Sequence, residues 1–300
     1  MGVEYRHRPR HESGVVTTPG APYTFAFNGW LFGGPGQGVQ VLNIDGLEDV
    51  PTLRTQDESR GYSDGQFSGR DFLNGRSIVT TLQIMSDSVN PMQTYLLQLK
   101  NNLLSQTTGL GTLQMYLPNR GVQRVYARVR RRNIDIDPDY VYGRATAKVE
   151  FFCPDPRIYN DIETSSTFVA NAGSLRTYNR TYNLTYSIAA AATGFTTVTQ
   201  VGNYETWPVF TITGACTAPV ITNVTTGQTL TFPSLTMSAG DTLTVNSDLR
   251  TVLLNGGAAR NLLGNTSAWW SLPPNVATTF TLSAAAGTPS ATITFRDAYI

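Results

Sequence analysis

Histidine and cysteine are scarce in this chain of 300 residues. The only histidines, His7 and His11, lie near the N-terminus, so a serine or cysteine nucleophile would depend on the first residues for an imidazole base. Cys153 and Cys216 are too few for a disulfide framework and are expected to be small buried thiols. These absences argue against nucleophilic catalysis and against a fold held together by disulfides.

Long apolar runs and a large net charge are also missing. No run approaches the roughly 20 residues that a membrane-spanning helix needs. The formal net charge is +1, so overall charge favours neither nucleic acid nor membrane as a partner. The first residues, MGVEYRHRPRHESG, are polar and lack the apolar centre of a secretory signal. We therefore expect a protein that is made and assembled in a cytosol, with no membrane partner.

One segment has the form of a catalytic motif. Residues 61–65, Gly-Tyr-Ser-Asp-Gly, match the G-x-S-x-G elbow of α/β-hydrolases, which needs a strand before it, a helix after it and a later histidine. The following residues, QFSGRDFLNGR, have no helical spacing, and no histidine follows. The segment is therefore predicted to be a turn.

Metal and phosphate motifs are incomplete. His7 and His11 have no third zinc ligand at the usual spacing. Residues 135–139, DIDPD, start like a calcium loop but lack its glycine and final glutamate, so we expect a polar turn. Residues 33–38, GGPGQG, lack the Lys-Ser/Thr of a phosphate-binding loop. We predict no enzyme activity and no catalytic, cofactor or metal residues, with a carboxylate pair for glycoside hydrolysis left open because its separation is spatial.

The density of charge divides the chain. Residues 1–160 hold seventeen basic and fifteen acidic residues, whereas residues 161–300 hold five and six, with Thr, Ala, Asn and Gly in their place. Two prolines in FFCPDPRIYN interrupt regular structure near residue 160, where the density of charged residues falls. This composition predicts one domain over 1–160 and a second over 161–300.

The first domain is predicted to be a sheet with one packed helix. Asn90 can cap a helix, Pro91 suits its first position, and apolar residues recur at helical spacing as far as Leu103. This pattern places a helix near residues 91–105. Segments such as GVQVLNI, RSIVTTLQIM and ATAKVEFF have the pattern of strands around it.

The second domain is predicted to consist of strands throughout. In PVFTITG, Phe210 and Ile212 alternate with threonines, and DTLTVNS, TTFTLSAA and ATITFRDAY repeat the scheme. Apolar residues that alternate with threonine fit antiparallel strands with one buried face. Turn signals between short strands favour a β-sandwich. The expected fold class is therefore mainly β, with an α+β N-terminal domain.

A dense run of arginines is the most conspicuous charged feature. In RGVQRVYARVRRRN, read as a strand, Val125, Ala127 and Val129 face inward while Arg124, Arg128 and Arg130 face outward. A basic face of this kind is compatible with nucleic acid. The nearby aspartates favour instead a face that is solvated or that contacts another subunit. The candidate subunit-contact residues are Arg124, Arg128, Arg130, Arg131 and Arg132.

Aromatic residues in the second half allow a carbohydrate hypothesis. Tyr204, Trp207, Trp269, Trp270 and Tyr299 include side chains that stack on sugars when exposed, although most tryptophans of a sandwich belong to its core. If the adjacent pair Trp269 and Trp270 lies in a strand, the two rings point to opposite faces. These two residues are the candidates for glycan stacking.

The order of motifs resembles the distal tail proteins of bacteriophages with long, non-contractile tails. In the first half the resemblance rests on VLNIDGLEDVPTLR, on RGYSDGQFSGRDFLNGRSIVTTLQI and on VYARVRRRNIDIDPDYVYGRATAKVEFFCPDPRIY. In the second half it rests on GNYETWPVFTITG, on TGQTLTFPSLTMSAGDTLTVNSDLRTVLLNG, on SAWWSLPPNVATTFTLSA and on ATITFRDAY. The resemblance covers most of the chain and is weaker before residue 23 and across 161–200.

The resemblance implies a fold and a role. It implies an N-terminal split-barrel domain, similar to that of tail tubes, that forms a homo-hexameric ring, and a galectin-like C-terminal sandwich. Such a ring joins the tail tube protein to the hub, tip and tape measure proteins of the virion tail tip. The expected role is structural, with no sequence-specific nucleic acid bound. The alternatives are a receptor-recognition protein that binds host-surface carbohydrate, a degradative enzyme of the virion surface, and a tail tube protein.

Overall fold

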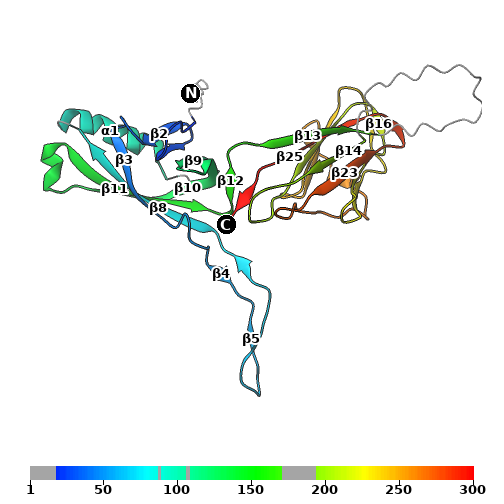
Figure 1. The fold of residues 1–300 in the computed structure, drawn as a ribbon, viewed down its shortest axis with the longest axis horizontal. Helices are drawn as coiled ribbons and strands as arrows, with labels where there is room; N and C mark the ends of the chain where they lie inside the picture. The colour runs from blue at the N-terminus through cyan, green and yellow to red at the C-terminus, as the bar shows by residue number, and fades with distance from the viewer. Residues whose placement is uncertain (1–17, 87–88, 106–108, 171–193) are drawn as a thin grey trace, which may run out of the picture. The chain divides into compact units, whose positions relative to one another are not determined.

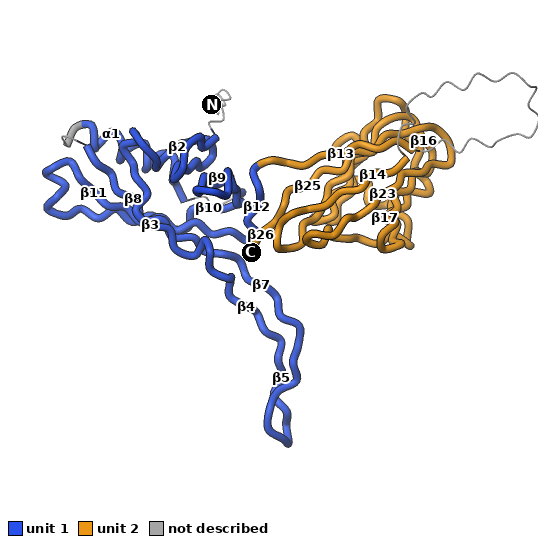
Figure 2. The backbone as a smooth tube through the Cα atoms, in the orientation of Figure 1, with its two compact units in different colours: residues 1–161, 300 blue, residues 162–299 orange. Residues whose placement is uncertain are grey.

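The structure is a computed structural model that describes residues 18–86, 89–105, 109–170 and 194–300. Backbone contacts divide the chain into two compact units, unit 1 with Met1–Asp161 and Ile300, and unit 2 with Ile162–Tyr299 (Figure 2). The described residues form many strands and one α-helix, which confirms the mainly β fold class (Figure 1). None of the described helices is long and apolar enough to cross a membrane.

Unit 1 is a mainly antiparallel assembly of strands with one α-helix among its described residues. Its helices are α1 (Val89–Asn102) and the short 3-10 helix η1 (Pro138–Tyr142). Its strands are β1 (Thr24–Phe27), β2 (Trp30–Gly33), β3 (Val39–Asp45), β4 (Leu53–Arg54), β5 (Glu58–Ser59), β6 (Gln66–Phe67), β7 (Phe72–Leu73), β8 (Arg76–Met85), β9 (Gly111–Leu117), β10 (Gly121–Asp135), β11 (Arg144–Cys153) and β12 (Ile158–Asn160). The main sheet runs β2-β1-β9-β10-β11-β8-β3, with β12 beside β10.

Strand β10 connects the two halves of this sheet. Residues 121–127 pair with β9, and residues 128–135 pair with β11. Val125, Ala127 and Val129 are buried, as the alternation of the sequence predicts. The register with β11 shifts between Val129 and Arg131, so Arg130 is the extra residue of a β-bulge. The bulge changes which later residues of the strand face outward.

Helix α1 covers the apolar side of the sheet. It begins at Val89 and ends at Asn102, so it starts and stops a little earlier than the predicted range near 91–105. Asn90 consequently lies inside the helix rather than ahead of it. Met92, Leu96 and Leu99 are buried, which confirms the helical spacing of the apolar residues.

A long hairpin projects from the sheet of unit 1 (Figures 1 and 2). We call residues 50–75 the arm; within it β4 pairs with β7 and β5 pairs with β6. Every residue from 52 to 71 is exposed. A two-stranded ribbon of this kind is only marginally stable alone in water, because it has no second layer on which to bury apolar surface. No pattern in the sequence predicted the arm.

Unit 2 is built of short antiparallel strands. They are β13 (Thr164–Val169), β14 (Phe195–Val198), β15 (Val209–Thr213), β16 (Cys216–Thr217), β17 (Val220–Asn223), β18 (Gln228–Thr231), β19 (Thr236–Met237), β20 (Thr242–Asn246), β21 (Thr251–Leu254), β22 (Gly257–Ala258), β23 (Thr278–Ser283), β24 (Ala286–Gly287), β25 (Ser290–Phe295) and β26 (Ala298–Tyr299). A 3-10 turn, η2 (Arg260–Leu262), follows β22. One sheet runs β13-β25-β15-β20-β21-β22 and another runs β14-β23-β17-β18.

These two sheets share one apolar core, which makes unit 2 a sandwich. Phe210 and Ile212 of β15 are fully buried together with Phe280 of β23 and Ile221 of β17. The rings of Phe210 and Phe280 meet edge to face, with centroids 5.3 Å apart. The alternation of apolar residues and threonine therefore predicted the buried face of these strands correctly.

Candidate assembly surfaces

The five candidate arginines of β10 have different surroundings. Arg124 forms an ion pair with Asp161, with 2.6 Å between Nη2 and the carboxylate, and its Nε also donates to that carboxylate. Burial alone would lower the pKa of Arg124, but the hydrogen bond and charge of Asp161 raise it above its usual range. Gln114 donates to the same carboxylate over 2.8 Å. Arg124 therefore acts inside unit 1 and offers little surface to another subunit.

Arg128 and Arg130 share one aromatic ring. Their guanidinium carbons lie 5.5 and 3.3 Å from the centre of the Phe152 ring. Arg130 is exposed and Arg128 is half-buried. Guanidinium groups attract the face of an aromatic ring, so Phe152 holds both charges at the outer face of the sheet. Of the five arginines, this pair is the one best placed to present charge to another molecule.

The β-bulge at Arg130 shifts the alternation of β10 by one residue, so Arg131 rather than Arg132 faces outward. Arg131 faces outward, where it lines a shallow pocket of about 350 Å³ with Lys148 and Glu150. Arg132 turns toward the helix and donates from Nη1 to the carbonyls of Lys100 and Leu103, over 2.8 and 3.0 Å. Those carbonyls lie at the C-terminal end of α1, where the helix dipole favours a positive charge. Arg132 is therefore a helix cap, a role that alternation alone would not reveal.

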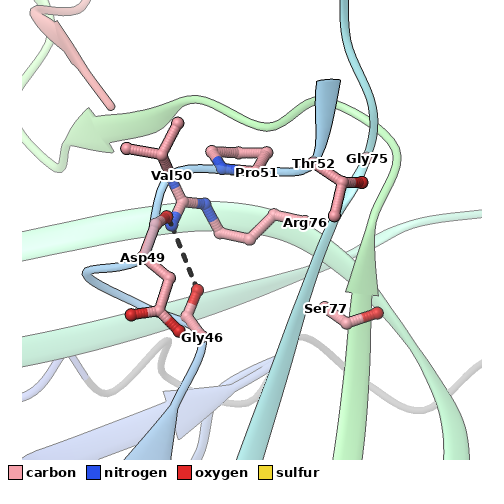
Figure 3. Close-up of a pocket in the computed structure, with 8 residues that line it drawn as sticks. All are labelled: Gly46, Asp49, Val50, Pro51, Thr52, Gly75, Arg76 and Ser77. Carbon is pink, nitrogen blue, oxygen red and sulfur yellow. Dashed lines mark hydrogen bonds between the residues drawn. The ribbon is translucent and has the colours of Figure 1, made fainter. Parts of the chain in front are cut away.

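The root of the arm is held by a buried arginine. Nη1 of Arg76 donates to the carbonyls of Leu47 and Asp49, both over 2.6 Å. It also donates to the carbonyl of Gly46 over 3.1 Å (Figure 3). Its Nε donates to the carbonyl of Pro156 over 2.9 Å. Desolvation by burial lowers the pKa of Arg76. These hydrogen bonds tie the chain just before the arm to the start of β8, and the side chain also lines a pocket of about 270 Å³.

The three motifs that resemble catalytic or ligand sites are connections. Residues 61–65 form the bend between β5 and β6 at the tip of the arm, where the amide of Arg60 donates to the carbonyl of Gly65 over 3.3 Å. Residues 33–38 lead from β2 to β3, and residues 135–139 lead from β10 into η1. The two predicted turns are therefore confirmed. His7 and His11 lie outside the described residues, and the described part of the chain contains no group of acidic, histidine or cysteine residues able to hold a metal.

The connection between β10 and β11 exposes apolar residues in a defined conformation. We call residues 135–143 the knob. Ile136, Val141 and Tyr142 are 76%, 72% and 75% exposed. The Asp137 carboxylate accepts from the amide of Asp139, and Gly143 ends η1 with a positive φ. The knob therefore presents three large apolar side chains from a capped turn.

The two candidate glycan-stacking residues are placed differently. Trp270 is 4% exposed, and its ring lies 6.1 Å from the rings of Phe210 and Phe280 in the core of unit 2. Trp269 is half-buried, with the Arg260 guanidinium 6.0 Å from its ring centre. The pair lies outside any strand, so the alternation argument does not apply to it. A stacking role would rest on Trp269 rather than on Trp270.

Comparison with known families gives a match in unit 2. Residues 201–299 match the family model described as "Siphovirus-type tail component, C-terminal domain". The predicted resemblance to distal tail proteins is confirmed by this match and by the fold described next. None of the functionally curated proteins compared with the sequence matches it.

Comparison with solved structures extends over nearly the whole chain. The crystal structure of SPP1 Dit (gp 19.1), described as a paradigm of the hub adsorption apparatus in phages that infect Gram-positive bacteria, superposes with a TM-score of 0.66 at 16% identity. The alignment covers 92% of this chain and 99% of that one. A chain of the phage P2 baseplate in its activated conformation with Ca gives a TM-score of 0.49 at 11% identity, with 90% and 97% of the two chains covered.

Proposed function

Because unit 2 carries the C-terminal domain of siphovirus-type tail components and the chain has the fold of SPP1 Dit, we propose that this protein is a non-enzymatic structural subunit of a phage tail tip. Its copies form a ring, six in number, that joins the tail tube to the hub or baseplate. The partners are further copies of the chain, the tail tube protein and the hub, tip and tape measure proteins. Assembly takes place in the host cytoplasm and the product is part of the virion tail.

The observation that carries this proposal is the match of fold along 92% of the chain together with the family match over residues 201–299. The family match concerns unit 2, whereas the match of fold extends over both units. The structure of unit 1 supports a role in assembly, because an exposed arm, a capped apolar knob and an arginine-bearing face are poorly explained by the stability of a lone subunit.

Native mass spectrometry and class averages of the purified full-length chain test the proposal. The expected result is a closed ring with sixfold symmetry. A chain that stays monomeric over the whole accessible concentration range, or that degrades host cell-wall polymer through a single essential carboxylate, contradicts it.

The arginines at the outer face of β10 give a second test. We expect the charge reversal Arg128→Glu with Arg130→Glu to impair assembly of the ring or tail, because it places two carboxylates against the Phe152 ring. Arg250→Glu, a charge reversal at an exposed position of unit 2, is the matched control. Normal assembly with altered release of DNA would instead place this face on the wall of the channel.

Recognition of host carbohydrate is a separate candidate that depends on Trp269. Glycan binding by the full-length protein that Trp269→Ala abolishes would add this function to the structural one. Binding that persists in this variant would place the glycan site elsewhere.

A further inference from the structure

We propose that the knob of one copy binds the arm of the next copy, so that the ring closes head to tail through this contact. The proposal rests on the proposed function, because it names the surfaces that would join the subunits of the ring. Both surfaces belong to unit 1 and are composed of residues that the structure describes.

The knob has the composition of a buried contact although it lies at the end of a hairpin. Connections between strands usually carry glycine, asparagine or serine at such positions. Here Ile136, Val141 and Tyr142 are each more than 70% exposed. The amide of Ser86 donates to the carbonyl of Gly143 over 3.0 Å, which ties the end of the knob to the chain after β8. A turn that is held in place loses little conformational entropy when it binds, and this favours tight association.

Three carboxylates, of Asp135, Asp137 and Asp139, belong to the same segment as these apolar side chains. Asp135 accepts from the side-chain amide of Asn133, and Asp137 accepts from the backbone of η1. Asp139 is exposed. Within the described residues, none of the three forms an ion pair with a cation. The knob therefore presents exposed apolar side chains together with carboxylates that have no ion-pair partner in the described residues, which suits a partner that combines apolar surface with arginine or lysine.

The arm combines arginines with exposed apolar side chains. Arg54 and Arg70 lie over the Phe72 ring, and Arg60 lies over the Phe67 ring, at 5.1 to 5.3 Å from the ring centres. In the described part of the chain these arginines have no carboxylate partner within ion-pair distance. Large apolar side chains are exposed beside them: Leu53, Tyr62 and Phe67.

The arm also carries carboxylates, which limits where the knob can bind. Asp57 accepts from the amide of Gly69 over 2.9 Å and is engaged within the arm. Glu58 pairs across the ribbon with Phe67. Asp64 lies in the bend between β5 and β6, and Asp71 directly precedes β7. Attraction for the knob is therefore local to the three stacked arginines and does not arise from the net charge of the arm.

The register of the sheet places the two surfaces at opposite ends of unit 1. Arg76, at the root of the arm, pairs with Cys153, whereas Met85 pairs with Arg144 next to the knob. The paired strands β8 and β11 rise about 3.4 Å for each residue, so the root of the arm and the knob are separated by roughly 30 Å along the strands. Two different complementary surfaces on one subunit produce a heterologous contact, which closes into a ring when the rotation allows.

The first experiment removes each surface separately in the full-length chain. The knob variant is Ile136→Ser, Val141→Ser and Tyr142→Ser; the arm variant is Arg54→Asp and Arg60→Asp. Each is expected to raise the concentration for half-assembly of the ring by at least about tenfold, as for loss of the central residues of an interface. The matched control is Leu97→Ser with Leu104→Ser, which removes two exposed leucines of unit 1 outside both surfaces.

The second experiment mixes the two variants. The knob variant keeps a normal arm and the arm variant keeps a normal knob, so a head-to-tail contact forms once between them and cannot continue. We expect native mass spectrometry to show one-to-one heterodimers and no rings. Rings or larger oligomers in the mixture would overturn the proposal.

A charge exchange within one chain completes the test. We expect Asp135→Arg with Asp139→Arg to raise the concentration for half-assembly of the ring. The addition of Arg54→Asp and Arg60→Asp to the same chain is expected to lower that concentration again by at least a few-fold. Wild-type rings with both single-surface variants unaffected contradict only the contact between knob and arm. Wild-type chain that never forms a ring contradicts the proposed function itself.

Discussion

The outer faces of the two units differ in how their polar side chains are satisfied. In unit 1, Arg130, Arg124 and Arg132 are held by an aromatic ring, a carboxylate and helix carbonyls, all distant in sequence. In unit 2, the register brings Thr167, Thr292, Thr211 and Thr244 into one row across neighbouring strands. The hydroxyls of Thr167 and Thr292 hydrogen-bond to each other over 2.9 Å.

This difference indicates that the surface of unit 1 is suited to recognising a partner, whereas that of unit 2 mainly stabilises its own sheets. Charged groups held at fixed positions select a partner and its orientation, which suits the unit that we propose to build the ring. Hydroxyls that bond to their neighbours stabilise a sheet without a charged surface to direct association. The second sheet of unit 2 follows the same scheme, with Thr281, Thr222 and Thr229 aligned across three strands.

The largest effect is expected in the core of unit 2. Phe210→Ala removes a fully buried ring from contact with Trp270 and Phe280 and should lower the unfolding free energy of unit 2 by about 3–5 kcal/mol. Calorimetry should show the transition of unit 2 shifted and that of unit 1 in place. Phe195→Ala, at a half-exposed phenylalanine of the same unit, is the control and should change little. A shift of both transitions would show that the two units unfold together.

The next effect compares two ion pairs of unit 1 that differ in burial. Arg124 with Asp161 and Arg120 with Glu48 have the same 2.6 Å separation, but the side chains of the first pair are 19% and 15% exposed and those of the second 50% and 56%. Asp161→Ala should cost about 2 kcal/mol, since it leaves a mostly buried guanidinium without its carboxylate. Glu48→Ala should cost less than about 0.5 kcal/mol. Urea denaturation of both variants measures the difference, and equal costs would refute the argument from burial.

A smaller effect is expected at the cap of α1. Arg132→Ala removes the donor to the carbonyls of Lys100 and Leu103 and should lower stability by about 1 kcal/mol. Arg131→Ala, one residue away and facing solvent, serves as the comparison. Hydrogen exchange at the end of α1 should increase only in the first variant. Equal exchange in both would mean that the cap does not hold the helix end.

The smallest effect concerns pH and the two buried thiols, of which each unit has one. Burial raises the pKa of Cys153 to about 12 from an ordinary value of 9.0, so the folded state holds the proton more tightly than the unfolded state. The stabilisation is complete below pH 9 and is lost as pH rises toward 12. At pH 9.5 the loss should be below about 1 kcal/mol. Unfolding titrations of the wild type and Cys153→Ala should diverge only above pH 9; divergence below pH 9 would contradict this assignment.

Local periodicity accounts for what could be predicted. Alternation of apolar residues with threonine identified the buried faces of β15, β23 and β25, and three-to-four spacing identified the buried face of α1. Incomplete motifs could be assigned to connections because each lacked a required residue. These inferences depend only on residues that are close in sequence, so they can be made without knowledge of the tertiary structure.

Contacts between distant segments account for what could not be predicted. Alternation along β10 holds as far as Val129 and then fails, because the bulge at Arg130 changes the phase and directs Arg132 to the end of α1. No local pattern distinguished Trp270 in the core from Trp269 at its edge, since the pair lies outside any strand. The arm was missed because its paired segments are only two residues long.

The sequence by itself determined that the described part of this chain is mainly β with one α-helix, because the spacing of apolar residues is a local property of the sequence. The tertiary structure alone decided which arginines serve the interior and which face outward, and that an arm and an apolar knob project from unit 1. Whether a charged side chain supports the interior or faces outward depends on the groups that it contacts in the folded structure. For Arg124, Arg130 and Arg132 those partners lie tens of residues away along the chain, and only the folded structure brings them together.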